Sequence, residues 1–198
     1  SSAVSIKTPE GLEKIHTLLR DTDIFIDGYR PDALPSHGLG PHAVARIRPG
    51  IVCVSLSAYA HNGPWAKRRG FDSLVQSLNG MDHSEGLAAG EAHPRVLPCQ
   101  ALDHVCGYMI AAAAMMVRAR QAEEGGSWLI RVSLDRAGQW IWSQGQIQDG
   151  FDVDSPYGAI RDLREAIEAP IGTVEGLRHA AILSETPTFW ARPPVSIG

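Results

Sequence analysis

The chain has 198 residues, of which 44% are hydrophobic and 20% are charged, and its formal net charge is -4. This composition is typical of a globular protein with a buried core, and the lack of a basic block argues against nucleic acid or an anionic membrane surface as a partner. No apolar run reaches the roughly 18 residues of a membrane span. Three cysteines without a CxxC pair favour a reducing compartment, so we expect a cytoplasmic protein. Because the sequence opens Ser-Ser-Ala, we also expect it to be a piece of a longer chain.

The first part of the chain alternates predicted helices and strands. Thr8-Pro9-Glu10 indicates the start of a helix, and residues 24–26 follow as a short buried strand. A second helix is predicted over residues 42–48. The strand after it, residues 51–57, is β-branched and almost continuously apolar, which is typical of the centre of a parallel sheet. Loops follow both strands at the edge where open α/β sheets bind ligands.

The middle of the chain predicts one long helix between a loop and a third strand. Residues 82–94 are polar and contain glycine and alanine, so we expect a loop there. A helix rich in small apolar residues then begins near Asp103 and ends at Gly125-Gly126. Residues 128–134 are predicted to form a strand of the same sheet, with a further helix after it.

The C-terminal part gives weaker patterns. Residues 149–158 have the composition of a linker, residues 163–167 and 176–183 are weakly helical, and the proline-containing residues 186–194 are expected to be irregular. The predicted fold is therefore α/β, with a parallel Rossmann-like sheet flanked by helices in residues 1–143. Residues 144–198 are predicted to be a linker and an irregular C-terminal extension that wraps the domain or a partner.

Asp103 has two interpretations from its local sequence. It stands near a helix N-terminus, where backbone N–H groups and the helix dipole favour a negative charge, so an N-capping role is the simpler one. A nucleophilic carboxylate is the other. Arg30, held extended by Pro31, is similarly open between phosphate or carboxylate binding and plain solvent exposure, and so is the basic run 67–69.

Five segments, in order, resemble the motifs of the class III CoA-transferases, the family of formyl-CoA, carnitine-CoA and bile-acid-CoA transferases and 2-methylacyl-CoA racemases. Asp103 falls where the family places its nucleophilic aspartate, and Gly107 falls at the trailing glycine of that motif. The other similar segments are residues 24–31 with 38–40, residues 52–64, residues 69–76 and residues 125–134. The resemblance implies the family's large domain over residues 1–143.

The same resemblance implies a reaction and a set of contacts. Asp103 would form an aspartyl intermediate that passes CoA from an acyl-CoA to a carboxylic acid, with CoA or acyl-CoA as substrate and no permanently bound cofactor or metal. The family forms interlocked dimers, so we expect a homodimer or an assembly with the remaining chain. The residues expected to contact CoA are Gly28, Tyr29, Arg30, Arg69, Gly70, Phe71, Asp72, Ser73, Leu74 and Val75.

Two other functions remain open from the sequence. The first is a catalytically silent CoA-binding or scaffolding relative, in which Asp103 would serve only as a cap. The second is an acyl-CoA racemase or epimerase. Phe71 disfavours the second, because the racemases carry an acid/base histidine at this position and a phenylalanine cannot transfer a proton.

Overall fold

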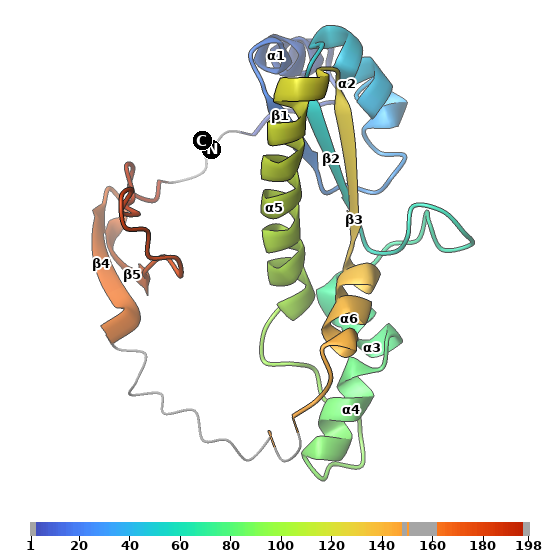
Figure 1. Cartoon of the computed structure of the whole chain (residues 1–198), viewed down its shortest axis with the longest axis vertical. Helices are drawn as coiled ribbons and strands as arrows, with labels where there is room; N and C mark the ends of the chain where they lie inside the picture. Colours follow the sequence, from blue (N-terminus) through green and yellow to red (C-terminus); the bar gives the residue numbers. More distant parts are fainter. Residues whose placement is uncertain (1–2, 148–149, 151–161, 196–198) are drawn as a thin grey trace. The chain divides into compact units, whose positions relative to one another are not determined.

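The computed structural model describes residues 3–147, 150 and 162–195. The chain forms two compact units, one of residues 5–151 and the other of residues 152–198 together with residues 1–4. The first unit, Ser5–Phe151, contains a parallel sheet with helices around it (Figure 1). Its elements in chain order are α1 (Pro9–Arg20), β1 (Ile24–Asp27), the 3₁₀ helix η1 (Pro35–His37), α2 (Pro41–Ile47), β2 (Val52–Ser57), α3 (Asp72–Leu78), α4 (Met81–Ala88), α5 (Ala101–Glu124), β3 (Trp128–Ser133) and α6 (Leu134–Ser143).

The sheet of this unit has the strand order β1-β2-β3, and both pairings are parallel. The central strand β2 is the most buried, which agrees with its β-branched, apolar sequence. Its neighbours are in register, so that Cys53 lies between Phe25 and Leu129. The predicted α/β class and the parallel sheet flanked by helices are confirmed.

Helices cover the two faces of the sheet with separate apolar clusters. On one face, Cys53 packs with Leu19 of α1 and Val44 of α2. On the other face, Leu56 and Val132 pack against a cluster that includes Leu102 and Cys106 of α5, together with residues of α3 and α6. Because successive strand residues point to opposite faces, one short sheet supports both clusters.

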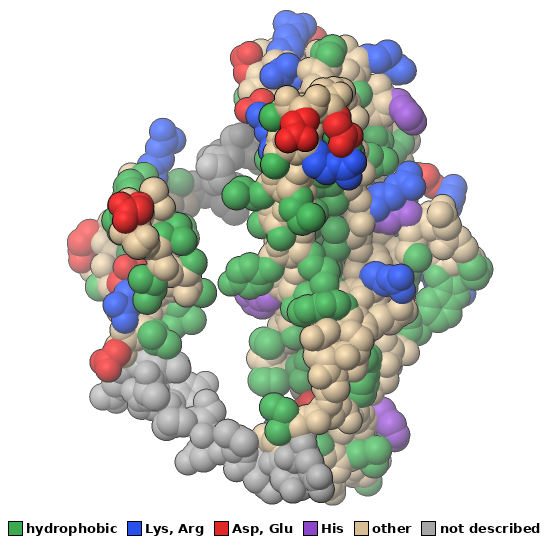
Figure 2. Space-filling view, viewed as in Figure 1, with side chains coloured by type: hydrophobic (Ala, Val, Ile, Leu, Met, Phe, Trp, Pro, Cys, Tyr) green, Lys and Arg blue, Asp and Glu red, His purple; other side chains and the backbone are tan. Residues whose placement is uncertain are grey.

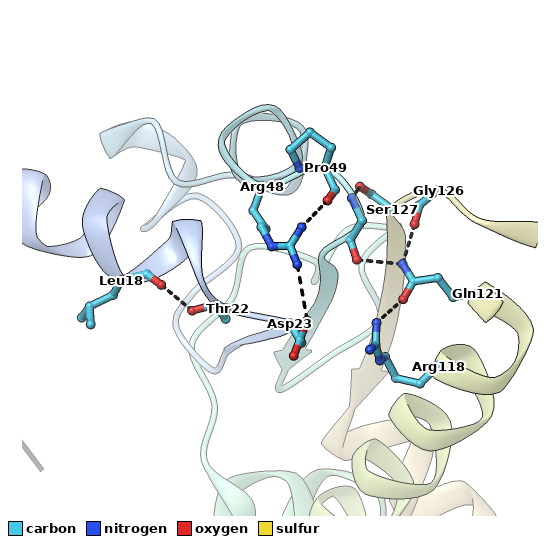
Figure 3. A network of polar contacts seen from close by, with 10 residues as sticks. Leu18, Thr22, Asp23, Arg48, Pro49, Arg118, Gln121, Gly126 and Ser127 are labelled. Atoms are coloured by element: carbon cyan, nitrogen blue, oxygen red, sulfur yellow. Dashed lines mark hydrogen bonds and ion pairs between the residues drawn. The ribbon is translucent and has the colours of Figure 1, made fainter.

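A polar network fixes the amino ends of the strands (Figure 3). The Gln121 side-chain amide donates to the carbonyl oxygens of Gly50 and Gly126, at 2.7 and 2.5 Å. The Gly50 N–H donates to the Ser127 hydroxyl at 2.9 Å, and Arg48 lies 3.5 Å from the Asp23 carboxylate. These bonds join the end of α5 to the starts of β2 and β3, at the amino edge of the sheet.

Three of the sequence predictions are wrong. Residues 82–88 of the expected loop 82–94 belong to helix α4. The weak helices expected over residues 163–167 and 176–183 are absent: strands occupy residues 164–169 and 172–177, and residues 178–183 have no helix or strand. In the C-terminal unit, β4 (Arg164–Ala169) pairs antiparallel with β5 (Gly172–Leu177), and Gly172, with φ of 112°, begins β5 after the tight turn. The extension is therefore only partly irregular. Both strands alternate half-buried and exposed residues, as expected when one face of a hairpin is covered.

The rest of the C-terminal unit follows the prediction. Residues 186–194 have no helix or strand, and the rings of His179 and Trp190 stack with centroids 4.5 Å apart. Of the predicted linker 149–158, all but Gly150 lies outside the described residues. That residues 144–198 wrap the domain or a partner stays a prediction. None of the described helices is both long enough and apolar enough to cross a membrane.

Candidate active site

Two loops meet just before α3, where the run Arg69-Gly70-Phe71 approaches the loop after β2. A Cβ atom on Gly70 would lie 2.6 Å from the Cβ atom of Ala58, so a side chain at Gly70 would force the loops apart. Phe71 is the N-cap residue of α3 and has 73% of its surface exposed. The glycine therefore allows the chain to enter α3 close to the carboxyl end of the sheet.

Asp72, the first residue of α3, is buried and forms the centre of a hydrogen-bond network. It is only 3% exposed. One carboxylate oxygen accepts from the side-chain amide of Gln76, and the other accepts from the backbone N–H of Asp103 at 2.9 Å. That backbone N–H belongs to the first turn of α5, where it lacks a partner within the helix. Asp72 thus serves α5 as a cap supplied from another helix.

Gln76 extends this network to the segment that leads into α5. Its side-chain amide also donates to the Cys99 carbonyl oxygen at 3.2 Å, and its amide oxygen accepts the Leu97 N–H at 3.1 Å. Gln76 is 1% exposed, so these bonds form away from solvent, where an unpaired polar group is costly. Together, Asp72 and Gln76 fix the approach to α5 and its first turn.

Asp103 itself is the third residue of α5 and not its cap. The N-cap residue is Gln100, and no side chain caps the helix from that position. The N-cap role for Asp103, the simpler interpretation of its sequence, is therefore wrong. Within the described part of the chain, no hydrogen bond or ion pair engages the Asp103 carboxylate.

The surroundings of Asp103 suit a carboxylate that meets a substrate. Its side chain is exposed, and one turn later Gly107 has nothing within 4 Å of the position that a Cβ atom would occupy. Partial burial and the charge of Asp72 raise the pKa of Asp103, and the charge of His104 opposes this shift. The first turn of α5 thus presents the Asp103 carboxylate, which has no hydrogen-bond partner among the described residues, and the position of a Cβ atom at Gly107 one turn later is open.

The predicted CoA contacts lie in two places. Arg69 to Val75 surround the start of α3 and connect to Asp103 through Asp72, whereas Gly28 to Arg30 follow β1 at the carboxyl edge of the sheet. Tyr29 is 65% exposed, and its backbone N–H donates to the Asp27 carboxylate at 2.8 Å. The Asp72 side chain is engaged by Gln76 and Asp103, and Val75 is fully buried in the core. Of the predicted contacts within α3, Ser73 and Leu74 are exposed.

The sequence did not single out Gln76, although it ends a segment that resembles the family. The available signal was its spacing from Asp72: residues four apart lie on one face of a helix and can bond to each other. A cavity of about 530 Å³ also borders the segment that Gln76 holds. Leu97, Pro98 and Trp142 line it, and Asp103 does not.

Comparison with known proteins identifies the family. Residues 1–194 match the sequence model of CoA-transferase family III. The chain belongs to this family. It is 26% identical over 134 residues to the probable fatty acyl-CoA transferase Rv3272 of Mycobacterium tuberculosis. The matched region covers 68% of this chain and 34% of that protein. It is 31% identical over 129 residues to human succinyl-CoA:glutarate CoA-transferase, covering 65% of this chain and 29% of the relative. The chain thus spans about a third of the length of these relatives.

Solved structures give the same fold. A crystal structure of Rv3272 from Mycobacterium tuberculosis is similar with a TM-score of 0.66 at 26% identity, over 73% of this chain and 40% of that one. A CaiB/BaiF family protein from Brucella suis has a TM-score of 0.67 at 20% identity, over 86% of this chain and 46% of that one, and supports the fold alone. The resemblance found in the sequence motifs is confirmed.

Proposed function

We propose that this chain carries the aspartate-bearing part of a CoA-transferase, which moves CoA from an acyl-CoA to a carboxylic acid through Asp103. The observation that supports this most is that the backbone of Asp103 is fixed by a hydrogen bond and its side-chain carboxylate is not. Its backbone N–H is bonded to the buried Asp72 at 2.9 Å, whereas no hydrogen bond or ion pair to its carboxylate is found among the described residues. A side chain with a purely structural role in a first turn would be expected to accept a backbone N–H.

The proposed reaction proceeds by acyl and CoA exchange on one carboxylate. An oxygen of the Asp103 carboxylate attacks the thioester carbonyl, and the CoA thiolate leaves, which gives a mixed anhydride. The thiolate then attacks the aspartyl carbonyl carbon, so that the donor acid departs as a carboxylate and an aspartyl-CoA thioester remains. The acceptor carboxylate repeats these two steps in reverse, which forms the new acyl-CoA and restores the Asp103 carboxylate.

The surroundings of Asp103 support this sequence of steps. The start of a helix carries backbone N–H groups and a positive dipole end, which favour the negative charge that develops on oxygen during each attack. The exposed rings of Tyr29 and Phe71 and the cation of Arg30 are proposed to bind CoA, with Arg30 near its phosphates. CoA and acyl-CoA are substrates in this scheme.

The proposed partner is a second copy or the remaining chain. Apolar side chains lie along the exposed side of α5, where Tyr108, Met115 and Met116 have more than half of their surface exposed (Figure 2). An exposed apolar strip of this kind is typical of a surface that another polypeptide covers. This supports the prediction of a homodimer or of an assembly with further chain.

The decisive experiment traps the aspartyl intermediate. The protein is incubated with a panel of acyl-CoAs, quenched with hydroxylamine and digested for peptide mass spectrometry. We expect a hydroxamate on Asp103 in the wild type, none in Asp103→Asn, and an unchanged hydroxamate in Asp21→Asn, which alters an exposed carboxylate at the end of α1. CoA binding without any adduct on Asp103 would contradict the proposal and favour a silent CoA-binding relative.

A further inference from the structure

A row of polar side chains crosses the sheet at its carboxyl end, away from the network around Asp103. Asp27, Ser55 and Arg131 are register partners on β1, β2 and β3. Because they are in register, the three side chains point to the same face of the sheet, with neighbours about 5 Å apart. This is the edge at which open parallel sheets bind ligands.

His61 folds back over the end of β2 and is held by two serines. Its Nε2 atom lies 3.3 Å from the Ser55 hydroxyl, and its Nδ1 atom lies 3.5 Å from the Ser57 hydroxyl. The Ser57 hydroxyl donates to the Tyr59 carbonyl oxygen at 2.6 Å, so it accepts from Nδ1, which leaves Nε2 to accept from Ser55 in the neutral ring. Burial and the nearby charge of Arg131 lower the pKa of His61.

Two neighbouring cavities share His61 and Arg131. One, of about 220 Å³, is also lined by Asp27, Pro31 and Ser55. The other, of about 430 Å³, is also lined by Ser133 and the first turns of α6. None of the residues that line them belongs to the network of Asp72, Gln76 and Asp103.

The guanidinium of Arg131 is available to a ligand. Among the residues that the structure describes, no hydrogen bond or ion pair to Arg131 is found. Asp27 is separated from it by Ser55, and its carboxylate accepts the Tyr29 N–H at 2.8 Å. The other two charged residues of the larger cavity are bonded to Gln139: Arg136 donates to its amide oxygen at 3.0 Å, and Asp135 accepts from its amide nitrogen at 3.1 Å.

We infer that Arg131 and His61 form a binding site for an oxyanion, a phosphate or a carboxylate group, at the carboxyl end of the sheet. Arg131 provides the fixed positive charge and a fork of N–H donors that matches two oxygens. The ring of His61 lines both cavities beside Arg131, and the two serines fix its orientation. The site is separate from Asp103, and it does not depend on the proposed CoA transfer.

The test is a titration of the whole chain with inorganic phosphate and, separately, with acetate, followed by ¹H–¹⁵N NMR. We expect saturable shifts of the amides of Ser55, His61 and Arg131. Arg131→Gln should weaken binding at least about tenfold, as expected when a charge-assisted pair is lost, whereas Arg131→Lys should keep part of it. Arg46→Gln, which removes an exposed arginine of α2, is the matched control and should bind as the wild type does.

The two titrations distinguish the sources of the anion. Tighter binding of phosphate assigns the site to a phosphate-bearing ligand, and tighter binding of acetate assigns it to a carboxylic acid. Equal affinity of the wild type and Arg131→Gln would overturn the inference, and so would shifts confined to other parts of the chain. The wild-type and variant spectra without ligand establish that the variants fold.

Discussion

The carboxylate of Asp72 accepts the backbone N–H of Asp103 at 2.9 Å, so a buried acid of α3 holds an exposed acid of α5 in place. The two groups are coupled in a second way, because the negative charge of Asp72 raises the pKa of Asp103. Position and protonation of the proposed nucleophile therefore depend on the same neighbour.

Replacement of Asp72 by Asn should shift the pH dependence of transfer. Asp103 must be ionised to attack, so activity is lost as the pH falls through its pKa. Burial and the Asp72 charge raise this pKa, and removal of the charge should move the acidic limb of the profile to lower pH. The measurement is kcat/KM against pH. An acidic limb that stays in place, or moves to higher pH, would contradict the coupling.

Replacement of Asp103 by Asn should abolish turnover while the protein remains folded. The amide keeps the size of the side chain, and the bond that Asp72 accepts comes from the backbone, which is unchanged. Loss of a nucleophile of this kind lowers kcat by about 10⁴-fold or more. Steady-state kinetics measure the loss of turnover, and thermal unfolding of the same sample shows whether the protein remains folded. Retained activity would exclude Asp103 as the nucleophile.

Gln76→Leu should destabilise the protein. The change removes the amide that bonds to Asp72 and to the Cys99 carbonyl oxygen, and it leaves the Leu97 N–H without its acceptor. Because unsatisfied buried groups cost about 1–3 kcal/mol each, we expect a loss of about 3 kcal/mol in the free energy of unfolding. Urea denaturation measures it. The control Gln139→Leu, on the exposed side of α6, should change it by less than about 0.5 kcal/mol.

Alanine substitutions at two helical glycines should have opposite effects on stability. At Gly107 the new methyl group meets nothing within 4 Å, so the helix should gain about 0.5–1 kcal/mol. At Gly86 the methyl carbon would lie 2.3 Å from the His93 carbonyl oxygen, which forces the backbone to shift and lowers stability. Thermal unfolding compares them. If Gly107→Ala also lowers kcat/KM, the open space beside Asp103 is used by the substrate.

The three cysteines should differ in reactivity towards iodoacetamide. Cys99 is exposed, whereas Cys53 and Cys106 are buried. Burial and the charges of Asp103 and Asp72 raise the pKa of Cys106 to about 11, and burial also raises that of Cys53, so both are thiols at pH 8. Mass spectrometry of the native protein should show alkylation at Cys99 alone. Modification of Cys106 under native conditions would show that α5 opens.

The strands of the parallel sheet and the long helix could be predicted from the sequence because their signals are local. The β-branched run of β2 and the Gly125-Gly126 stop of α5 indicate their elements without any tertiary information. Helix α4 was missed because its segment is polar and contains a glycine. Gly86 is tolerated there because the chain around His93 packs directly against it, and only the folded structure shows this contact.

The β4–β5 hairpin was missed for a related reason. Residues 164–169 contain glutamate and alanine, which are depleted in strands, and their sequence alternates only weakly between polar and apolar residues. The alternation of exposed and half-buried side chains is seen only in the paired strands. At the candidate site, the local sequence pattern placed Asp103 near the start of a helix, and the structure has it in the first turn of α5. The bond from Asp72 crosses from one helix to another, and no spacing in the sequence encodes such a contact.

The parallel pairing of β2 with β3 also constrains how the protein folds. The bond between Gly50 and Ser127 joins positions 77 residues apart, and α5 lies in the chain between them. Closure of so long a loop costs entropy before the pairing returns any stability, so folding is slow compared with that of helical proteins. During synthesis β1 and β2 leave the ribosome well before β3. Until β3 is made, the apolar strand β2 has one edge unpaired, and an unpaired apolar edge favours aggregation.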